Sequence, residues 1–174
     1  MSHMQPLVLI NAVGLTPKLL KFAPNLAAIA QKGWYRPLSE CLPAVTTSAQ
    51  ATILTGQNPN VHGIVGNGWY FRDLAEVGFW KQSNHLVQAP KIWDELKALD
   101  PRFTCAKMFW WYNMYSTADW SVTPRPMYPA DGRKVFDVTS HPLSIRDEIK
   151  RDLGPFPFPA FWGPMAGIAS SQWI

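Results

Sequence analysis

Apolar and polar residues follow two kinds of pattern along the chain, short continuous apolar runs and helical periods. Residues 7–10 form a continuous apolar run, which is typical of a strand buried on both faces of a sheet. Similar runs predict strands over residues 103–110 and 119–123. The helical patterns cover residues 24–30 before Gly33, residues 47–54 before Gly56, residues 91–97 with Pro90 in the first helical position, and residues 142–153 before Gly154. Strands that alternate with helices predict an α/β fold, a three-layer sandwich around a mainly parallel sheet.

Prolines and glycines mark the segments between these elements. Asn, Pro and Gly cluster at residues 58–60 and 66–68, where we expect turns. Pro alternates with Phe over residues 155–159, which we expect to exclude regular structure. Residues 169–174 have the pattern of a further helix that is just beginning.

The composition indicates one folded domain with long, ordered loops. The chain has 174 residues, of which 13% are aromatic and 16% charged, and it contains 16 Pro. Low charge and many rings exclude a disordered tail and a coiled coil. The net charge is +4 and the basic residues are scattered, so we expect solubility or a small anionic substrate to explain them rather than a nucleic-acid duplex. No apolar run approaches the roughly 20 residues that span a bilayer, so we expect no membrane partner.

Neither the cysteines nor the first residues fix the compartment. Cys41 and Cys105 lie far apart without a C-x-x-C spacing, so we expect two buried free thiols. Residues 1–4, which include His3, lack the charged and apolar segments of a signal peptide and resemble a vector scar. This pattern favours a cytoplasmic location, but mature exported chains lack signals as well, so the compartment stays open.

The segment with the most chemical information is residues 43–56. Thr47 and Gln50 fit a capping box, in which each side chain bonds the backbone N–H of the other, so one interpretation is an ordinary helix start. In that arrangement Thr46 lies just outside the helix with a free hydroxyl. The positive end of a helix attracts an anion, and a hydroxyl in that position can attack phosphorus. The segment therefore predicts either a helix cap alone or a nucleophile beside a cap.

The residues that follow favour the second interpretation. Thr46, the Thr55-Gly56 pair, Pro59 and His62-Gly63-Ile64 stand at intervals that resemble the alkaline phosphatase superfamily, in particular its type I phosphodiesterase/nucleotide pyrophosphatase branch. The Gly66-Asn67 continuation is similar to phosphonoacetate hydrolases of the same superfamily. The resemblance is clear over about residues 7–70 and looser beyond them.

The resemblance implies a metal-dependent hydrolase of phosphate mono- or diesters. It implies that Thr46 is the nucleophile and a metal ligand, that two divalent ions assist, Zn²⁺ in preference to Mn²⁺, and that the substrate is a small phosphoester or nucleotide-like molecule. Gln50 and Asn67 are the candidate substrate-binding residues, although Asn67-Gly68 also fits a tight turn. Gln50 is a candidate because it could substitute for an Asn that the family places where this chain has Ala49.

The chain departs from the family pattern at its metal ligands. Val13 replaces the Asp that the family places before the Gly-Leu turn, and Asn11, two residues earlier on the same strand face, is the candidate metal ligand instead. The alternative for Asn11 is a strand-end residue that bonds its own backbone. The later Asp-x-x-Gly-His and Asp-His-Gly stretches are missing, and no two His stand at ligand spacing. We therefore expect residues 5–174 to be the N-terminal part of a single, incomplete alkaline phosphatase-like domain that is inactive alone and need hold no metal.

Other readings of the sequence remain open. A relative that kept the fold and lost its metals, acting as a binding or scaffold protein, is the alternative that Val13 and Ala49 favour. A flavodoxin-like nucleotide binder would need a Gly-rich loop after the first strand, where Gly14 stands alone. Homo-oligomer formation is left open.

Three further segments allow both a structural and a functional interpretation. We expect His62 to fix a turn rather than bind metal. We expect residues 109–112 to pack in the core rather than stack on a base or sugar ring. We expect residues 131–134 to form a turn, although their charge would also suit phosphate.

Overall fold

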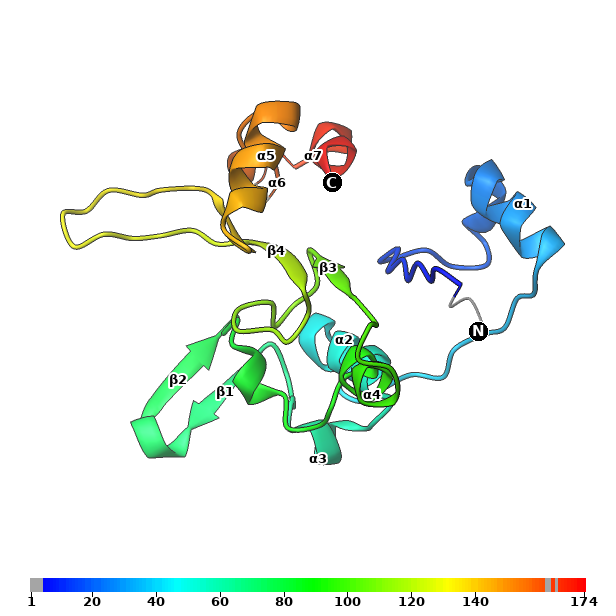
Figure 1. Cartoon of the computed structure of the whole chain (residues 1–174), viewed down its shortest axis with the longest axis horizontal. Coiled ribbons are helices and arrows are strands. Elements are labelled where there is room, and N and C mark those ends of the chain that lie inside the picture. The colour runs from blue at the N-terminus through cyan, green and yellow to red at the C-terminus, as the bar shows by residue number, and fades with distance from the viewer. Residues whose placement is uncertain (1–4, 162–163, 165) are drawn as a thin grey trace. The chain divides into compact units, whose positions relative to one another are not determined.

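The computed structural model describes residues 5–161, 164 and 166–174, so residues 1–4, expected to be a vector scar, lie outside the described residues. The chain divides into two compact units, Met1–Ser39 and Glu40–Ile174. Figure 1 shows the elements of both units in chain order. None of the described helices is long and apolar enough to cross a membrane.

The first unit contains a 3₁₀-helix, η1 (Leu20–Phe22), and the helix α1 (Pro24–Lys32), which confirms the helix predicted over residues 24–30. Gly33 ends α1 and its N–H donates to the Ile29 carbonyl. The strand predicted over residues 7–10 does not form, and the four apolar side chains there are exposed. A strand needs a partner for its backbone N–H and C=O groups, and no described residue of this unit forms one.

The second unit holds the remaining elements. Its helices are α2 (Thr46–Thr55), α3 (Pro59–His62), α4 (Ile92–Leu99), α5 (Ser144–Leu153), α6 (Phe158–Phe161) and α7 (Ile168–Trp173). Its strands are β1 (Gly68–Phe71), β2 (Glu76–Phe79), β3 (Ala106–Met108), β4 (Trp120–Pro124) and β5 (Val138–His141). Two short 3₁₀-helices, η2 (Arg72–Leu74) and η3 (Asn84–Leu86), join them. The helices predicted before Gly56 and Gly154 and the strand predicted over residues 119–123 are confirmed, and the helix predicted over residues 91–97 begins at Ile92, with Pro90 ahead of its cap rather than inside it.

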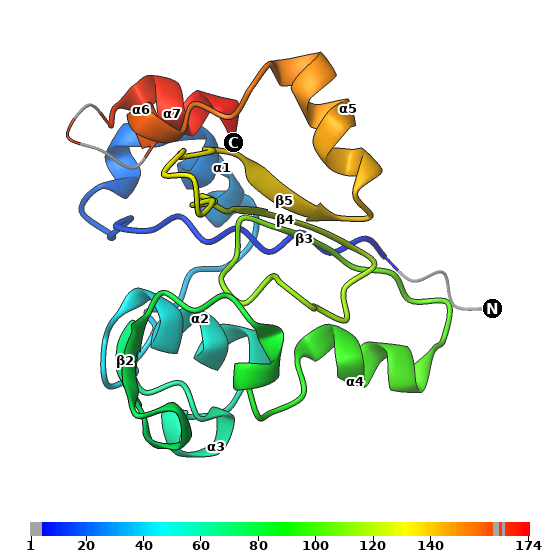
Figure 2. The same cartoon turned by 90° about the vertical axis from the view of Figure 1, so that its left-hand side faces the viewer.

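The larger sheet has the order β3-β4-β5 and mixed strand directions. β3 pairs with β4 in parallel, and β4 pairs with β5 in antiparallel. Figure 2 shows this sheet between α5, α6 and α7 on one side and α2 and α4 on the other. The described fold is thus mixed α/β, but a mainly parallel sheet is not confirmed, because one of the two strand pairs is antiparallel and β3 spans only three of the residues predicted over 103–110.

The side of the sheet beneath α5 is apolar. Val122 of β4 and Val138 of β5 are buried against Phe156 and Phe158, and Ile145 of α5 packs on the same cluster. The Pro-Phe segment that was expected to exclude regular structure therefore supplies core rings, and its last residues begin α6. Apolar burial of this kind contributes roughly 25 cal/mol for each Å² removed from water.

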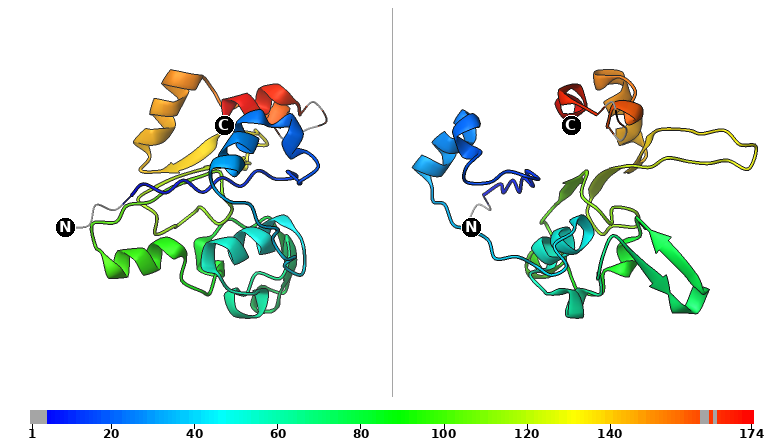
Figure 3. Two further views of the ribbon diagram at one scale, coloured as in Figure 1. Left: turned by 90° about the vertical axis from the view of Figure 1, so that its right-hand side faces the viewer. Right: turned by 180° about the vertical axis from the view of Figure 1, so that it is seen from behind.

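A two-stranded hairpin, β1–β2, was not predicted from the sequence. Gly68 pairs with Phe79, and a Cβ at Gly68 would lie 2.3 Å from a Phe79 ring carbon, so the pairing requires glycine there. Figure 3 shows the hairpin at the opposite end of the unit from α5, and shows that the loop between β4 and β5 projects from the sheet. That loop turns at Gly132, which has a positive φ, and Arg133 pairs with Asp131, which confirms the turn predicted over residues 131–134.

The segment between β3 and β4 has strained backbone. Phe109, Tyr112 and Tyr115 all have φ near +60°, a region that side chains with a Cβ adopt rarely. Trp111 and Tyr112 are buried against Ala51 of α2, which confirms the core packing predicted for residues 109–112. The two cysteines are free thiols as expected, but both are half-buried rather than buried.

Candidate active site

The first turn of α2 is held by the loop that precedes β1. Val45 occupies the N-cap position, where its side chain can accept no hydrogen bond. The Thr47 backbone N–H instead donates to Asn67 Oδ1 at 3.1 Å, and the Thr47 hydroxyl donates to the Gly66 carbonyl at 2.5 Å. A side-chain oxygen that accepts from one of the first N–H groups stabilises a helix start by about 1 kcal/mol. Asn67 therefore caps α2 from twenty residues away.

The capping box predicted for Thr47 and Gln50 does not form. The helix begins one residue earlier than expected, and the Thr47 hydroxyl is used by Gly66. Gln50 is buried in the following turn, where its Oε1 accepts the Trp111 backbone N–H at 2.7 Å. Thr47 and Gln50 bond Gly66 and Trp111 instead of each other's backbone. A sequence pattern of four residues cannot reveal partners that lie this far away.

Thr46 is the first residue of α2 and its side chain is exposed. Within the described residues neither its hydroxyl nor its backbone N–H has a hydrogen-bond partner. Two residues on, the Ser48 hydroxyl is fully buried and also lacks a partner in the described structure. Unpaired N–H groups and the helix dipole make this end of α2 electropositive. An exposed, unpaired hydroxyl therefore lies where an anion is stabilised.

Three of the four predicted site residues lie in the first two turns of α2 or directly against them. Thr46 and Gln50 belong to α2, and Asn67 bonds the residue next to Thr46. The amide nitrogens of Gln50 and Asn67 have no hydrogen-bond partner among the described residues, because only the oxygens are engaged. Asn11, the candidate metal ligand, is an exposed residue of the first unit.

His62 supports the turn that follows α2. It is fully buried, its Nδ1 accepts the Ile64 N–H at 3.1 Å, and its Nε2 lies 3.0 Å from the Thr52 hydroxyl. Burial lowers the pKa of His62, so the ring is held neutral and its proton sits on Nε2 as the donor to Thr52. Both ring nitrogens are used inside the fold, which confirms the prediction that His62 fixes a turn. No group of three His, Cys, Asp or Glu that could hold a metal ion occurs in the described parts of the chain.

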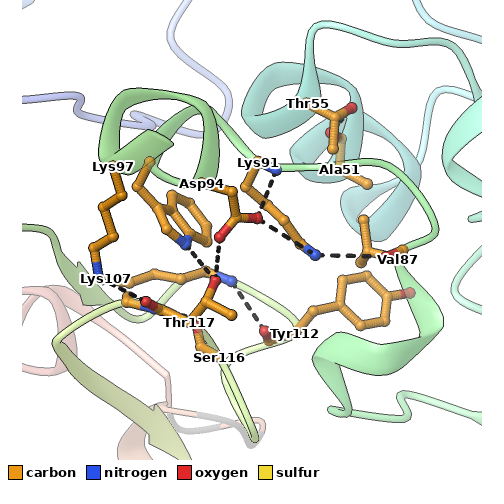
Figure 4. Close-up of polar contacts among 12 residues, drawn as sticks. Ala51, Thr55, Val87, Lys91, Asp94, Lys97, Lys107, Tyr112, Ser116 and Thr117 are labelled. Atoms are coloured by element: carbon orange, nitrogen blue, oxygen red, sulfur yellow. Dashed lines mark hydrogen bonds and ion pairs between the residues drawn. The ribbon is translucent and has the colours of Figure 1, made fainter. Parts of the chain in front are cut away.

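Two buried lysines, Lys91 and Lys107, line the same pocket as Ala51 of α2, and the sequence did not predict their burial. Figure 4 shows Lys91 and Lys107 with Asp94 and Tyr112, under Ala51 of α2. Lys107 is 3% exposed and its Nζ donates to the Tyr112 carbonyl at 3.0 Å. Burial, with a smaller contribution from Lys91, lowers the pKa of Lys107 to about 7. These two residues are therefore not among the surface charges that the composition had suggested.

The comparisons with known proteins agree with the spacing of these residues. The family model described as Type I phosphodiesterase / nucleotide pyrophosphatase matches residues 7–174. No curated protein and no solved structure matches the chain. The match covers nearly the whole chain and includes Thr46, Gln50 and Asn67. The chain belongs to the type I phosphodiesterase/nucleotide pyrophosphatase family.

Proposed function

We propose that this chain carries the nucleophile and the anion-binding groups of a phosphodiesterase/nucleotide pyrophosphatase-type hydrolase that acts on small phosphoesters or nucleotide-like molecules. The observation that supports this proposal most directly is the exposed Thr46 hydroxyl, unpaired among the described residues, at the start of α2. The family membership supports the reaction class.

Thr46 Oγ attacks phosphorus and the P–O bond to the leaving group breaks, with its electron pair going to the leaving oxygen. The proton that the Thr46 hydroxyl gives up ends on that oxygen, so the leaving group departs as an alcohol. Charge that develops on the non-bridging oxygens is stabilised by preorganised donors at the helix start, a form of electrostatic stabilisation that is usually a large part of catalysis. The donors of this chain are the Thr46 backbone N–H and the Asn67 amide Nδ2, which is held in place because Oδ1 caps α2. Water then cleaves the phospho-threonine and regenerates the hydroxyl.

Metal dependence is general in this family, and two divalent ions, Zn²⁺ or Mn²⁺, would supply charge neutralisation there. The described residues do not fit such a centre, because they contain no group of three metal-ligating side chains and Asn11 offers only a neutral amide. Each proposed step therefore uses only groups of this chain.

The nucleophile is tested by Thr46→Ala and Thr46→Ser in the full product of the gene, with p-nitrophenyl phosphate and a p-nitrophenyl diester as substrates. Thr46→Ala should lower kcat by about a thousandfold or more, since loss of a nucleophile removes the covalent route. Thr46→Ser keeps a hydroxyl and should retain part of the rate. Thr55→Ala is the matched control, because Thr55 lies at the other end of α2 and its hydroxyl bonds only Ala51 of the same helix and the N–H of Gln57.

A second measurement reports on the covalent step itself. Acid-quenched turnover followed by peptide mass spectrometry should find the phosphoryl group on Thr46 in the native protein and not in Thr46→Ala. Full activity in Thr46→Ala would overturn the nucleophile assignment. If the native protein has no hydrolase activity and forms no adduct, the non-catalytic alternative suggested by Val13 and Ala49 replaces this proposal.

A further inference from the structure

The face of the β3-β4-β5 sheet opposite α5 is polar where β4 meets β5. Ser121 lies opposite His141 and Thr123 lies opposite Thr139 in the antiparallel register. Directly paired residues share a face of the sheet, and so do residues two apart on one strand. Three hydroxyls and one imidazole therefore stand together on this face, and the side-chain hydroxyls of Ser121 and Thr139 make no hydrogen bond among the described residues.

Asn113 adds an unpaired acceptor to the same place. It is 3% exposed, and its Nδ2 donates to the Lys107 carbonyl at 3.0 Å and to the Val122 carbonyl at 2.6 Å. Both amide protons are used, so the orientation of the amide is fixed and Oδ1 is the free end. Within the described structure Oδ1 is buried and has no partner. A buried acceptor without a partner lowers the stability of the fold by about 1–3 kcal/mol, so a ligand that donates a hydrogen bond to it would be favoured.

These groups surround a cavity of about 350 Å³. The wall consists of the four side chains of the polar face, residues 113–116 and Ser140. The size lies within the range of small-molecule sites. Asp, Glu, Lys and Arg are absent from the described residues that form the wall. Tyr115, which is 70% exposed, adds an aromatic ring at the cavity and is held with a positive φ.

We propose that this cavity is a binding site for a neutral polyhydroxylated molecule, a monosaccharide or cyclic polyol. Such a ligand carries hydroxyls that donate to Asn113 Oδ1 and to Thr123 Oγ1, whose own proton is directed at Gln82 Oε1. The same ligand hydroxyls both donate to and accept from the Ser121 and Thr139 hydroxyls. Its C–H face packs on the Tyr115 ring. A wall without Lys or Arg offers a phosphate or a carboxylate no permanent positive charge to offset the cost of its desolvation. The site does not depend on the Thr46 chemistry, because none of its groups belongs to α2.

The test is titration of the full gene product with D-glucose and with myo-inositol, followed by amide chemical shifts in NMR spectra. At least one probe should bind saturably with a Kd of about a millimolar, as expected for a ligand of this size. The shifts should concentrate in residues 113–116, 120–124 and 138–141. D-glucose 6-phosphate should bind more weakly than D-glucose.

Two variants locate the site without disturbing the fold. Ser121→Ala and Thr139→Val each remove a hydroxyl that bonds no described residue, and each should weaken binding about three- to tenfold. Thr104→Val, at an exposed position outside the cavity, is the matched control and should not change the Kd. Thr46→Ala should leave sugar binding intact, which separates this proposal from the proposed function.

The proposal is overturned if neither probe saturates at high millimolar concentration. It is also overturned if Ser121→Ala and Thr139→Val bind as tightly as the native protein, or if the phosphorylated sugar binds more tightly than the neutral one.

Discussion

The two faces of the β3-β4-β5 sheet are built from the same strands but are stabilised in opposite ways. On the face toward α5, Val122 and Val138 are buried under Phe156 and Phe158, and the contacts are apolar. On the other face polar side chains are buried instead, with Lys107 on β3 and Thr123 on β4. The apolar face gains stability from every buried group, whereas the polar face is stable only where each group has a partner.

The difference between the two faces indicates which of them can bind a ligand. Apolar contacts are complete without a ligand. On the polar face, Asn113 Oδ1 and two hydroxyls are left without partners in the described structure. Fully used polar groups hold a fold together, and unused ones are available for binding. Four substitutions test this contrast, from the largest expected effect to the smallest.

The largest effect is expected at the polar face, from the pH dependence of Lys107. Because burial lowers its pKa from the ordinary 10.5 to about 7, the unfolded chain binds a proton on Lys107 that the folded chain does not between these two values. The free energy of unfolding should therefore fall as the pH is lowered from 10.5 to 7, by up to about 5 kcal/mol, and level off below pH 7. Urea denaturation across this pH range measures the free energy of unfolding.

Lys107→Met isolates this contribution. Burial raises the pKa of Tyr112 to about 12 and raises that of the Cys105 thiol, so both groups contribute to the pH dependence with the opposite sign in both chains. Lys107 lowers the Cys105 pKa by a smaller contribution, which the substitution removes as well. The free energy of unfolding of the native chain minus that of Lys107→Met should fall as the pH is lowered from 10.5 to 7, as predicted above for Lys107. Lys134→Met, at an exposed lysine, should reproduce the native profile. A profile that is identical in Lys107→Met and in the native chain would show that Lys107 is solvated.

On the apolar face, Phe156→Ala should lower the free energy of unfolding by about 3–5 kcal/mol. The ring is 5% exposed and contacts the rings of Phe109 and Phe161, so its removal leaves a cavity. Phe79→Ala is the matched control, because that ring is 65% exposed, and it should cost less than about 1 kcal/mol. Equal losses in the two variants would contradict the assignment of the core to the α5 side.

At the start of α2, Asn67→Ala should lower the free energy of unfolding by about 1–2 kcal/mol. The substitution removes the acceptor for the Thr47 N–H and hydroxyl. Asn60→Ala, at an exposed position in α3, should change it by no more than about 0.5 kcal/mol. Thermal denaturation of both variants checks the difference. An Asn67→Ala chain as stable as native would mean that water caps the helix equally well.

The smallest effect is expected for Thr139→Val, which removes a hydroxyl that bonds no described residue. Its free energy of unfolding should stay within about 0.5 kcal/mol of the native value. Calorimetric unfolding measures this, and a loss above 1 kcal/mol would mean that the hydroxyl has a structural partner. A stable variant that binds sugar poorly would separate binding from folding on the polar face.

Local patterns predicted the helices better than the strands. The helices α1, α2 and α5 begin and end near the predicted residues, because their periodicity and their closing glycines lie within a few residues of each other. Neither strand of the β1–β2 hairpin nor β5 was predicted, because strands of four residues with mixed polarity carry little period-2 signal. The apolar run at residues 7–10 predicted a strand that the first unit does not form.

The candidate site was predicted in its residues but not in their roles. The spacing of Thr46, Gly56 and His62 identified the family, and the turn role of His62 is confirmed by its two ring contacts. The hydrogen-bond partners predicted for Thr47 and Gln50 were wrong. Their actual partners, Asn67 and Trp111, lie far from them in the sequence. The assignments of Thr46 as nucleophile and Asn11 as metal ligand stay predictions.

By itself the sequence determined the end of α2 at Gly56, its beginning to within one residue, and the family to which the chain belongs. These features depend on neighbours within one or two turns, so a local pattern contains them. The tertiary structure alone decided that Asn67 caps α2, that Lys107 is buried with its pKa lowered to about 7, and that Asn113 keeps an unpaired oxygen in the described structure. Each of these depends on desolvation and on partners contributed by other elements, which no local pattern records.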